Sequence, residues 1–293
     1  MIKTPERTGL LMVAGAAIAW STSGLFIRAI DADVWTLLVW RGFVGAASIL
    51  VWMLLRDGVA GLSAFRTFRG QAWSYALTST FGMVSFITAF KYTSVADVLV
   101  IYAIAPFVVA AAAWLWFGEK STASTMLAAA VALTGVGITV AGATGGANWI
   151  GDLLALCMTV SVAAMTVIAR RYQAIPMTAA ACVSSLLSGL ISLPFAAPLS
   201  LRGVEMMGAV LFGVIAMGIA LSLYSEGARL APASRVSLVS TLETPLSPLW
   251  VWLTFGEQPA VTSLIGGTIV MVAVIGDIAF GARRRAPAAD LPS

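Results

Sequence analysis

The sequence predicts an all-α integral membrane protein whose ten transmembrane helices form two inverted five-helix repeats. Hydrophobic residues make up 60% of the 293 residues and charged residues only 10%, against about 25% in soluble domains. Ten apolar stretches each approach the roughly 20 residues that a helix needs to cross a bilayer. Because five is an odd number, a second copy of a five-helix unit enters the membrane from the opposite side.

The predicted spans follow one another with short connections. The second and eighth are long enough to tilt. The first is too long for a signal-peptide core and lacks a clear cleavage site, so we expect it to remain as a membrane helix. These lengths predict a first repeat over residues 1–146, a second over 147–282, and a short basic, disordered tail over 283–293. The spans themselves are 9–30, 34–56, 70–92, 95–117, 123–143, 149–170, 176–196, 204–228, 232–254 and 259–281.

The distribution of charge predicts the orientation. Most of the 17 Lys and Arg residues fall in loops on the side of the two termini, so both termini are expected in the cytoplasm of a bacterial-type inner membrane. The basic residues are scattered over separate loops and form no single face, so we expect no nucleic-acid partner. The expected partners are the lipid bilayer and a small-molecule substrate, with the chain acting as a monomer or a homodimer.

The residue types exclude several kinds of chemistry. The chain has no histidine, which rules out histidine zinc sites and nucleophile pairs that use histidine. Its two cysteines, Cys157 and Cys182, lie in separate apolar spans and are expected to be free thiols. The sequence also lacks a Gly-x-Ser-x-Gly elbow and a nucleotide loop. We therefore expect no enzyme, no cofactor and no metal site.

An internal repeat supports the two-unit plan. Phe117-Gly118-Glu119 recurs as Phe255-Gly256-Glu257, and the same offset places Lys91 on Arg229. Each Phe-Gly-Glu motif follows an apolar helix that contains a proline. Similar composition alone does not explain two such motifs in matching positions, so the sequence indicates an internal duplication.

These motifs resemble those of a known family. Tyr92-Thr-Ser before the fourth span, Pro106 within it and Gly118-Glu119 after it are similar to the EamA-type branch of the drug/metabolite transporter superfamily. The run Glu243–Trp250 resembles that of amino-acid exporters of the YddG type. The resemblance implies a ten-helix fold and the export of small metabolites through a central cavity that both halves line.

The ninth span carries the most polar helix face. Ser240, Glu243 and Ser247 recur at spacings of three and four residues, so they share one side of the helix. Glu243 lies near the middle of the membrane, where an ionisable group costs roughly 2.5–3.5 kcal/mol. We therefore expect it to face protein or a water-filled cavity.

Two prolines follow Glu243 in the same span. Pro245 and Pro248 each remove one helical N–H, which frees the carbonyls of Thr241 and Thr244. The loosened backbone either helps Glu243 to hold a substrate amine or an ion, or it only kinks the helix for packing while Glu243 bonds to a neighbouring helix.

The third and fourth spans offer further polar and aromatic side chains. Pro106 frees the carbonyl of Tyr102, whose ring either faces the cavity or bonds across a helix interface. Ser85 lies on a stripe of hydroxyl and aromatic residues, with Phe86 and Phe90 beside it. Hydroxyls in membrane helices more often join helices than bind a ligand.

The first two spans contribute a tryptophan, a serine and an arginine. Trp20 and Ser23 lie near the middle of the first span, whereas most other tryptophans, Trp250 included, lie near span ends, as an interfacial belt requires. Trp20 therefore either packs between helices or lines the cavity. Arg41 either anchors an anionic substrate group or pairs with carbonyls near the outer surface or with an acid, Asp31 or Asp33.

The candidate site collects these residues. We expect Asp152 and Asp277, which lie close to span ends, to be solvated or to cap helices. The predicted helix breaks are Pro106, Pro245 and Pro248. The predicted cavity residues are Trp20, Ser23, Arg41, Ser85, Phe86, Phe90, Tyr102, Ser240, Glu243 and Ser247.

The site predicts a secondary transporter. A mid-membrane acid beside aromatic rings suits small amphiphilic metabolites, above all amino acids including aromatic ones, exported by alternating access. Proton-coupled multidrug efflux is one alternative, although the first span holds no carboxylate. Sugar-phosphate or nucleotide-sugar exchange is another, although it favours more cavity Lys and Arg residues than this chain has. A passive membrane scaffold leaves the buried acid unexplained.

Overall fold

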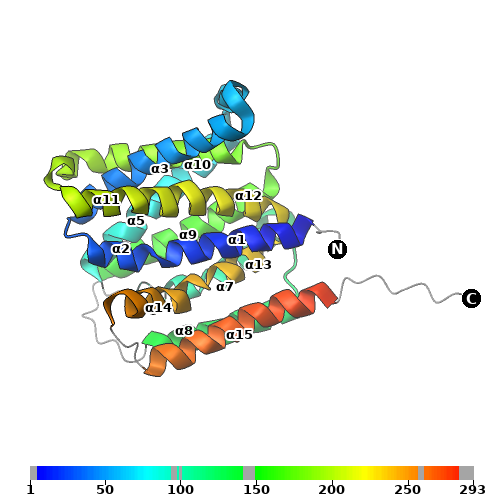
Figure 1. The fold of residues 1–293 in the computed structure, drawn as a ribbon. Helices are drawn as coiled ribbons and strands as arrows, with labels where there is room; N and C mark the ends of the chain where they lie inside the picture. The colour runs from blue at the N-terminus through cyan, green and yellow to red at the C-terminus, as the bar shows by residue number, and fades with distance from the viewer. Residues whose placement is uncertain (1–4, 94–97, 99–100, 141–148, 257–260, 284–293) are drawn as a thin grey trace, which may run out of the picture.

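A computed structural model of the chain describes residues 5–93, 98, 101–140, 149–256 and 261–283 (Figure 1). In these residues every regular element is helical, which confirms the predicted all-α class. The elements of the first half are α1 (Pro5–Ser21), α2 (Ser23–Ala29), α3 (Val34–Asp57), η1 (Gly58–Leu62), α4 (Ser63–Arg66), α5 (Gly70–Tyr92), α7 (Ala105–Phe117) and α8 (Ala123–Val140).

The second half also contains interrupted helices. A π-helical segment, η4, joins α11 to α12 without a break in the helix axis (Figure 1). The elements are α9 (Trp149–Arg171), α10 (Met177–Ser192), η2 (Leu193–Phe195), η3 (Pro198–Ser200), α11 (Gly203–Gly213), η4 (Val214–Leu221), α12 (Ser222–Leu230), α13 (Ala233–Ser240), α14 (Glu243–Phe255) and α15 (Val261–Arg283).

Several of these helices are suited to a bilayer. Three shorter apolar helices cover Ala105–Trp116, Ala123–Ile138 and Leu264–Asp277. Five in the described residues are long and apolar enough to cross a membrane: Pro5–Ile27, Val34–Arg66, Trp149–Arg171, Met177–Phe195 and Gly203–Leu230.

Helices of one half pack mainly against helices of the other. The most extensive pairings are α5 with α9, α3 with α10, α8 with α15 and α1 with α12. Small residues permit this close approach. A Cβ on Gly42 of α3 would lie 2.5 Å from the backbone nitrogen of Gly189 on α10, and one on Gly135 of α8 would lie 2.7 Å from the carbonyl oxygen of Gly266 on α15. The pair α8 and α15 forms one edge of the bundle (Figure 1).

Three of the predicted spans are interrupted near their middles. The first breaks at Thr22, where Ser21 Oγ donates to the carbonyl of Ile18 at 2.6 Å and Thr22 Oγ1 donates to that of Ala19 at 2.6 Å. Side-chain bonds of this kind compete with the helical ladder and bend helices. Sequence reasoning treated residues 9–30 as one continuous helix and missed this break.

The other two interruptions lie just before prolines. The chain turns at Ile104 and at Thr241–Leu242, so Pro106 and Pro245 fall in the first turns of α7 and α14. The missing N–H of proline is harmless in a first turn, because those donors have no intrahelical acceptor. The backbone of Pro248 lies inside α14, and its side chain is outside the described residues.

One expected consequence of these prolines is wrong. The carbonyl of Thr241 is not free, because it accepts the backbone N–H of Thr244 at 3.1 Å. The chain tightens from an i→i+4 to an i→i+3 bond at this point, so the turn itself satisfies the acceptor that Pro245 leaves behind.

The repeated Phe-Gly-Glu motif has a structural reason. Gly118 and Gly256 end α7 and α14, both with φ +70°. Their N–H groups donate to the carbonyls of Trp114 and Trp252 at 3.0 and 2.9 Å. A left-handed residue at a helix C-terminus is normally glycine. The two motifs therefore form the same cap at corresponding points of the two halves.

Candidate functional site

A cavity of about 90 Å³ lies in the middle of the bundle. Its walls come from both halves of the chain, from the α1–α2 region, α3, α5, α9, η4 and α14. Six of the predicted cavity residues line it: Trp20, Ser23, Arg41, Phe86, Tyr102 and Glu243.

The remaining predicted residues lie elsewhere or are not described. Ser85 is buried outside the cavity wall. Ser240 is also buried and donates to the carbonyl of Val236 at 3.0 Å, within its own helix. Ser247 packs beside Gly24, where a Cβ on the glycine would lie 2.9 Å from Ser247 Oγ. The side chain of Phe90 lies outside the described residues.

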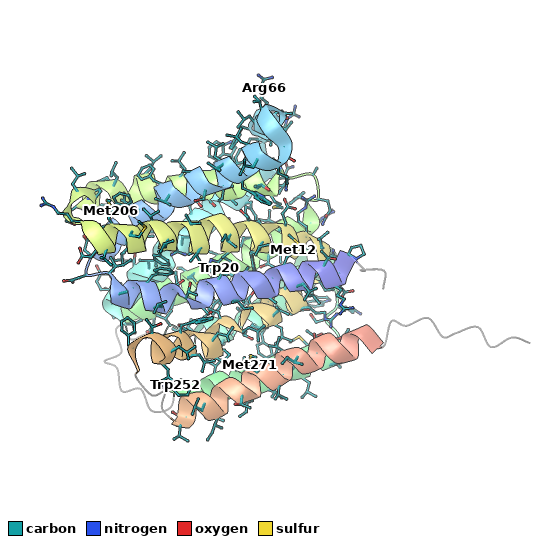
Figure 2. The ribbon with its side chains drawn as sticks, in the orientation of Figure 1. Met12, Trp20, Arg66, Met206, Trp252 and Met271 are labelled. Atoms are coloured by element: carbon teal, nitrogen blue, oxygen red, sulfur yellow. The ribbon has the colours of Figure 1, made fainter. Side chains whose placement is uncertain are left out.

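Trp20 both packs between helices and lines the cavity. Its Nε1 donates to the carbonyl of Ala216 in η4 at 2.8 Å, and its ring lies 5.1 Å from that of Tyr224 at an interplanar angle of 48°. Figure 2 places Trp20 midway along the bundle, far from Trp252 near one end. The hydrogen bond fixes the indole while leaving part of the ring in the cavity wall.

Arg41 is held in the cavity wall without a complete set of partners. The residue is 5% exposed, and its Nε and Nη1 have no hydrogen-bond partner. The guanidinium lies over the ring of Phe212, 5.2 Å from the centroid. A cation–π contact satisfies one face of the group but leaves in-plane N–H donors available.

Asp33, which was expected as a possible partner of Arg41, bonds to other groups. Asp33 caps α3, where one carboxylate oxygen accepts the N–H groups of Trp35 at 2.9 Å and of Thr36 at 3.0 Å. Its second oxygen accepts Thr36 Oγ1 at 2.5 Å. The expected pairing of Arg41 with Asp33 is therefore wrong, since a helix N-cap satisfies this carboxylate locally.

Glu243 and Arg41 line the same cavity. Glu243 is the first residue of α14, where the exposed N–H groups and the helix dipole favour a negative charge. The ion pairs of the described residues do not include one between these two side chains. The two groups therefore share one cavity without being paired to each other.

Methionines form much of the apolar wall, and sequence reasoning missed them. Met158 and Met165 project from α9, with Met83 from α5 and Met217 from η4. Met158, Val162 and Met165 recur at helical spacing, and this stripe was the available signal. Methionine side chains are flexible and polarizable and adapt to ligands of different shape.

Two buried tyrosines outside the cavity wall pair with hydroxyl groups of other helices. Tyr224 is 1% exposed and its hydroxyl lies 2.5 Å from Thr166 Oγ1. Tyr75 is fully buried and its hydroxyl lies 2.8 Å from Ser225 Oγ. The two tyrosines thus join α12 to α9 and to α5.

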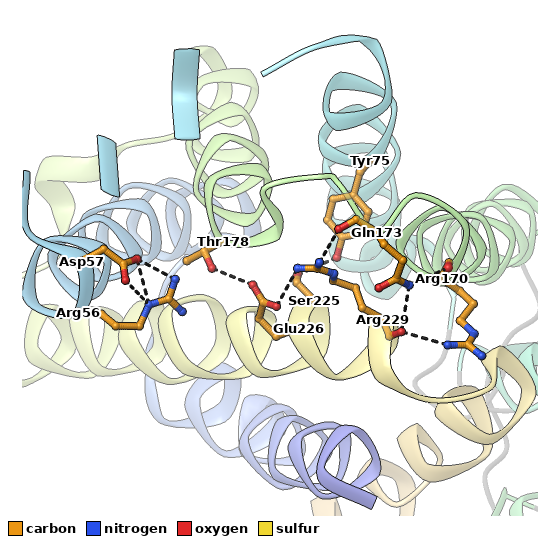
Figure 3. Close-up of polar contacts among 9 residues, drawn as sticks. All are labelled: Arg56, Asp57, Tyr75, Arg170, Gln173, Thr178, Ser225, Glu226 and Arg229. Carbon is orange, nitrogen blue, oxygen red and sulfur yellow. Dashed lines mark hydrogen bonds and ion pairs between the residues drawn. The ribbon is translucent and has the colours of Figure 1, made fainter. Parts of the chain in front are cut away.

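A polar network lies beyond the tyrosines (Figure 3). Arg229 pairs with Glu226 at 3.1 Å and also donates to the carbonyl of Gln173. Arg170 donates to the carbonyl of Arg229 at 3.1 Å and pairs with Glu119 at 3.5 Å. These bonds join α9 and α12 to the end of α7, so they tie the two halves together.

The described residues contain no group of three or more Cys, Asp or Glu residues that could hold a metal ion. Cys157 and Cys182 are free, and Cys182 Sγ donates to the carbonyl of Ala46 at 3.4 Å.

The apolar helices of the bundle indicate a multi-pass membrane protein. The chain belongs to the EamA-like transporter family, whose sequence model matches residues 7–141 and again 149–276. It is also similar to a protein of known crystal structure, with 20% sequence identity and a TM-score of 0.82 over 95% of this chain and 99% of the other. No protein in a search of curated sequences matches.

Proposed function

We propose that the chain is a secondary transporter that exports small amphiphilic metabolites, principally amino acids including aromatic ones, by alternating access. The observation that supports it best is the central cavity, in which Glu243 faces aromatic and methionine walls from both halves. Glu243 would bind the substrate ammonium, while Trp20, Phe86 and Tyr102 would contact its apolar part.

We further propose the finer topology. Ten spans form two inverted repeats, over residues 1–146 and 147–282, with a basic tail at 283–293. Both termini lie in the cytoplasm of a bacterial-type inner membrane. The start of α1 and the end of α15 lie at the same end of the bundle (Figure 1), which supports an even number of crossings. The matching glycine caps of α7 and α14 support the duplication.

Transport by the purified protein tests the function. Proteoliposomes are loaded with radiolabelled phenylalanine or leucine, and efflux is compared with that from protein-free liposomes loaded in the same way. We expect faster efflux with the wild type and a loss with Glu243→Gln, whereas Glu205→Gln on α11, whose carboxylate does not line the cavity, serves as the control. Normal efflux with Glu243→Gln would exclude the assigned site.

The competing functions give different results in the same assay. Export of cationic dyes but of no amino acid would indicate multidrug efflux, and exchange of sugar phosphates would indicate the third alternative. No movement of any solute would leave a scaffold role. The topology is tested separately with single cysteines at Ser63 and Ser200 in a cysteine-free background. A membrane-impermeant maleimide on intact cells should label Ser200→Cys and spare Ser63→Cys.

A further inference from the structure

We propose that the cavity selects zwitterions, with Arg41 binding the ligand carboxylate and Glu243 binding its ammonium. This inference rests on the proposed transport function and narrows its substrate class. Among the described residues that line the cavity, Arg41 and Glu243 carry the only charges, one positive and one negative. The site is therefore electrically neutral as a whole while it offers both signs of charge.

Neither charged side chain has its bonding groups fully paired within the protein. Nε and Nη1 of Arg41 lack partners although the residue is 5% exposed. No described hydrogen bond or ion pair is made by the Glu243 carboxylate. A buried polar group without a partner is costly and is retained where it has a function. The unused donors of Arg41 fit a carboxylate, which guanidinium binds in a planar, two-point geometry.

The two charged groups are not paired with each other. Arg41 and Glu243 line the same cavity, and no ion pair of the described residues joins them. A ligand with an ammonium next to a carboxylate can come between them and satisfy both. The result has no net charge, which matters because a net charge in a poorly hydrated site is strongly unfavourable.

The same arrangement disfavours ligands of single charge. A cationic amine would be attracted by Glu243 but repelled by Arg41, whose donors would stay unpaired. An organic acid would be attracted by Arg41 but repelled by Glu243, whose carboxylate would stay unpaired. Like charges placed together in a buried site cost several kcal/mol. The charge balance therefore argues against simple cations, the typical cargo of multidrug efflux.

The apolar part of the cavity wall determines which side chains the ligand can carry. Met83, Met158, Met165 and Met217 surround the charged pair with flexible apolar side chains. Such a wall accepts apolar groups of varied shape. The substrate class is thus an α-amino acid with an apolar side chain, and the fixed charges, not the side-chain pocket, provide most of the selectivity.

A ligand series tests the proposal on the full-length protein in detergent. Binding of phenylalanine is compared by calorimetry with that of phenethylamine, which lacks the carboxylate, and of 3-phenylpropionate, which lacks the ammonium. Leucine, isoamylamine and 4-methylpentanoate form a second series. We expect each amino acid to bind at least about tenfold more tightly than its two partners. Equal binding of an amine and its amino acid, or binding of neither amino acid, overturns the proposal.

Charge-neutralising variants then reverse the preference. Arg41→Met leaves Glu243 alone and should favour phenethylamine over phenylalanine, whereas Glu243→Gln should favour 3-phenylpropionate. Arg56→Met, which removes an arginine outside the cavity, should keep the wild-type order. A merely structural role for Arg41 would weaken all three ligands together, which contradicts the proposal. If Arg41→Met does not fold, Arg41→Lys replaces it and must keep the preference for the amino acid.

The failure of this inference is distinct from that of the transport function. Proteoliposomes that export phenylalanine and phenethylamine at equal rates would overturn zwitterion selection and leave transport standing. Proteoliposomes that export neither would overturn the function on which the inference rests.

Discussion

Arg235 of α13 and Asp277 of α15 form a buried ion pair, with Nε and Oδ2 2.9 Å apart and side chains 10% and 2% exposed. Nη2 of Arg235 also donates to the carbonyl of Asp277 at 2.7 Å, and Nη1 pairs with Glu6 of α1 at 2.7 Å. Thr125 of α8 donates to the other carboxylate oxygen at 2.9 Å. Four helices thus meet at one ion pair, and the expectation that Asp277 is solvated or capping is wrong.

Removing one member of this pair should destabilise the protein strongly. Asp277→Ala leaves the Arg235 guanidinium buried with an incomplete set of partners, and we expect the free energy of unfolding to fall by about 3–5 kcal/mol. Thermal unfolding in detergent measures it. Asp57→Ala is the control, because Asp57 pairs with Arg56 at 2.8 Å on the surface and should matter little. Equal decreases in melting temperature for the two variants would show that the buried ion pair contributes no more to stability than the surface pair.

The contact between α3 and α10 depends on a glycine. A Cβ at Gly42 would lie 2.5 Å from the nitrogen of Gly189 and 2.8 Å from the carbonyl oxygen of Ser185, both of them backbone atoms. Gly42→Ala should therefore push the helices apart and lower the free energy of unfolding by about 1–3 kcal/mol. Gly276→Ala in α15 meets nothing within 4 Å, so it should be neutral. An unchanged melting temperature for Gly42→Ala would mean that the helices adjust freely.

The indole N–H of Trp20 contributes to stability separately from its ring. Trp20→Phe keeps an aromatic surface in the cavity but removes the hydrogen bond to the Ala216 carbonyl, which should cost about 0.5–1.5 kcal/mol of folding free energy. Thermal unfolding of the variant measures it. Trp52→Phe alters a side chain that is 52% exposed and serves as the matched control. If both variants have the melting temperature of the wild type, the hydrogen bond to Ala216 does not contribute to stability.

Asp33 at the start of α3 should make stability depend on pH. Partial burial of the carboxyl raises its pKa, but hydrogen bonds from Thr36 and Trp35 outweigh this effect and leave the pKa below its usual value of 3.8. Because the folded state holds the carboxylate ionised more strongly than the unfolded state, the stabilisation is complete above pH 4 and is lost as the pH falls through the folded pKa.

The corresponding variant isolates this effect. The melting temperature of the wild type should exceed that of Asp33→Asn at pH 7, and the difference should shrink toward pH 3. Asparagine is a good N-cap that carries no charge, so the variant keeps the helix start. A difference that stays constant over this range would show that ionisation of Asp33 does not contribute.

Hydropathy and length predicted most helix positions. The predicted span 70–92 coincides with α5, and the predicted span 34–56 falls one residue short of the end of α3. The break at Thr22 and the π-helical η4 were not predicted, because both are differences in hydrogen-bond register within apolar stretches, and average hydropathy does not encode register.

The candidate site was predicted in part for a similar reason. Residues of unusual chemistry at mid-membrane depth, such as Glu243, Arg41 and Trp20, do line the cavity. Depth does not say which way a common side chain points, so Ser240 was expected in the cavity although it bonds within its own helix. Trp250 was expected in the interfacial belt, yet its Nε1 donates to Ser21 Oγ at 2.7 Å. The direction of such side chains depends on contacts with residues that are distant in sequence.

The π-helical segment constrains which deletions the gene can tolerate. A π-helix holds more residues per turn than an α-helix, so η4 accommodates extra chain length without displacing its flanks. Losing a single codon within Val214–Leu221 would therefore return the segment to an α-helix and leave Tyr224 beside Thr166 and Arg229 beside Gln173. The same loss within α9, which is α-helical throughout, would rotate the rest of that helix by about 100°.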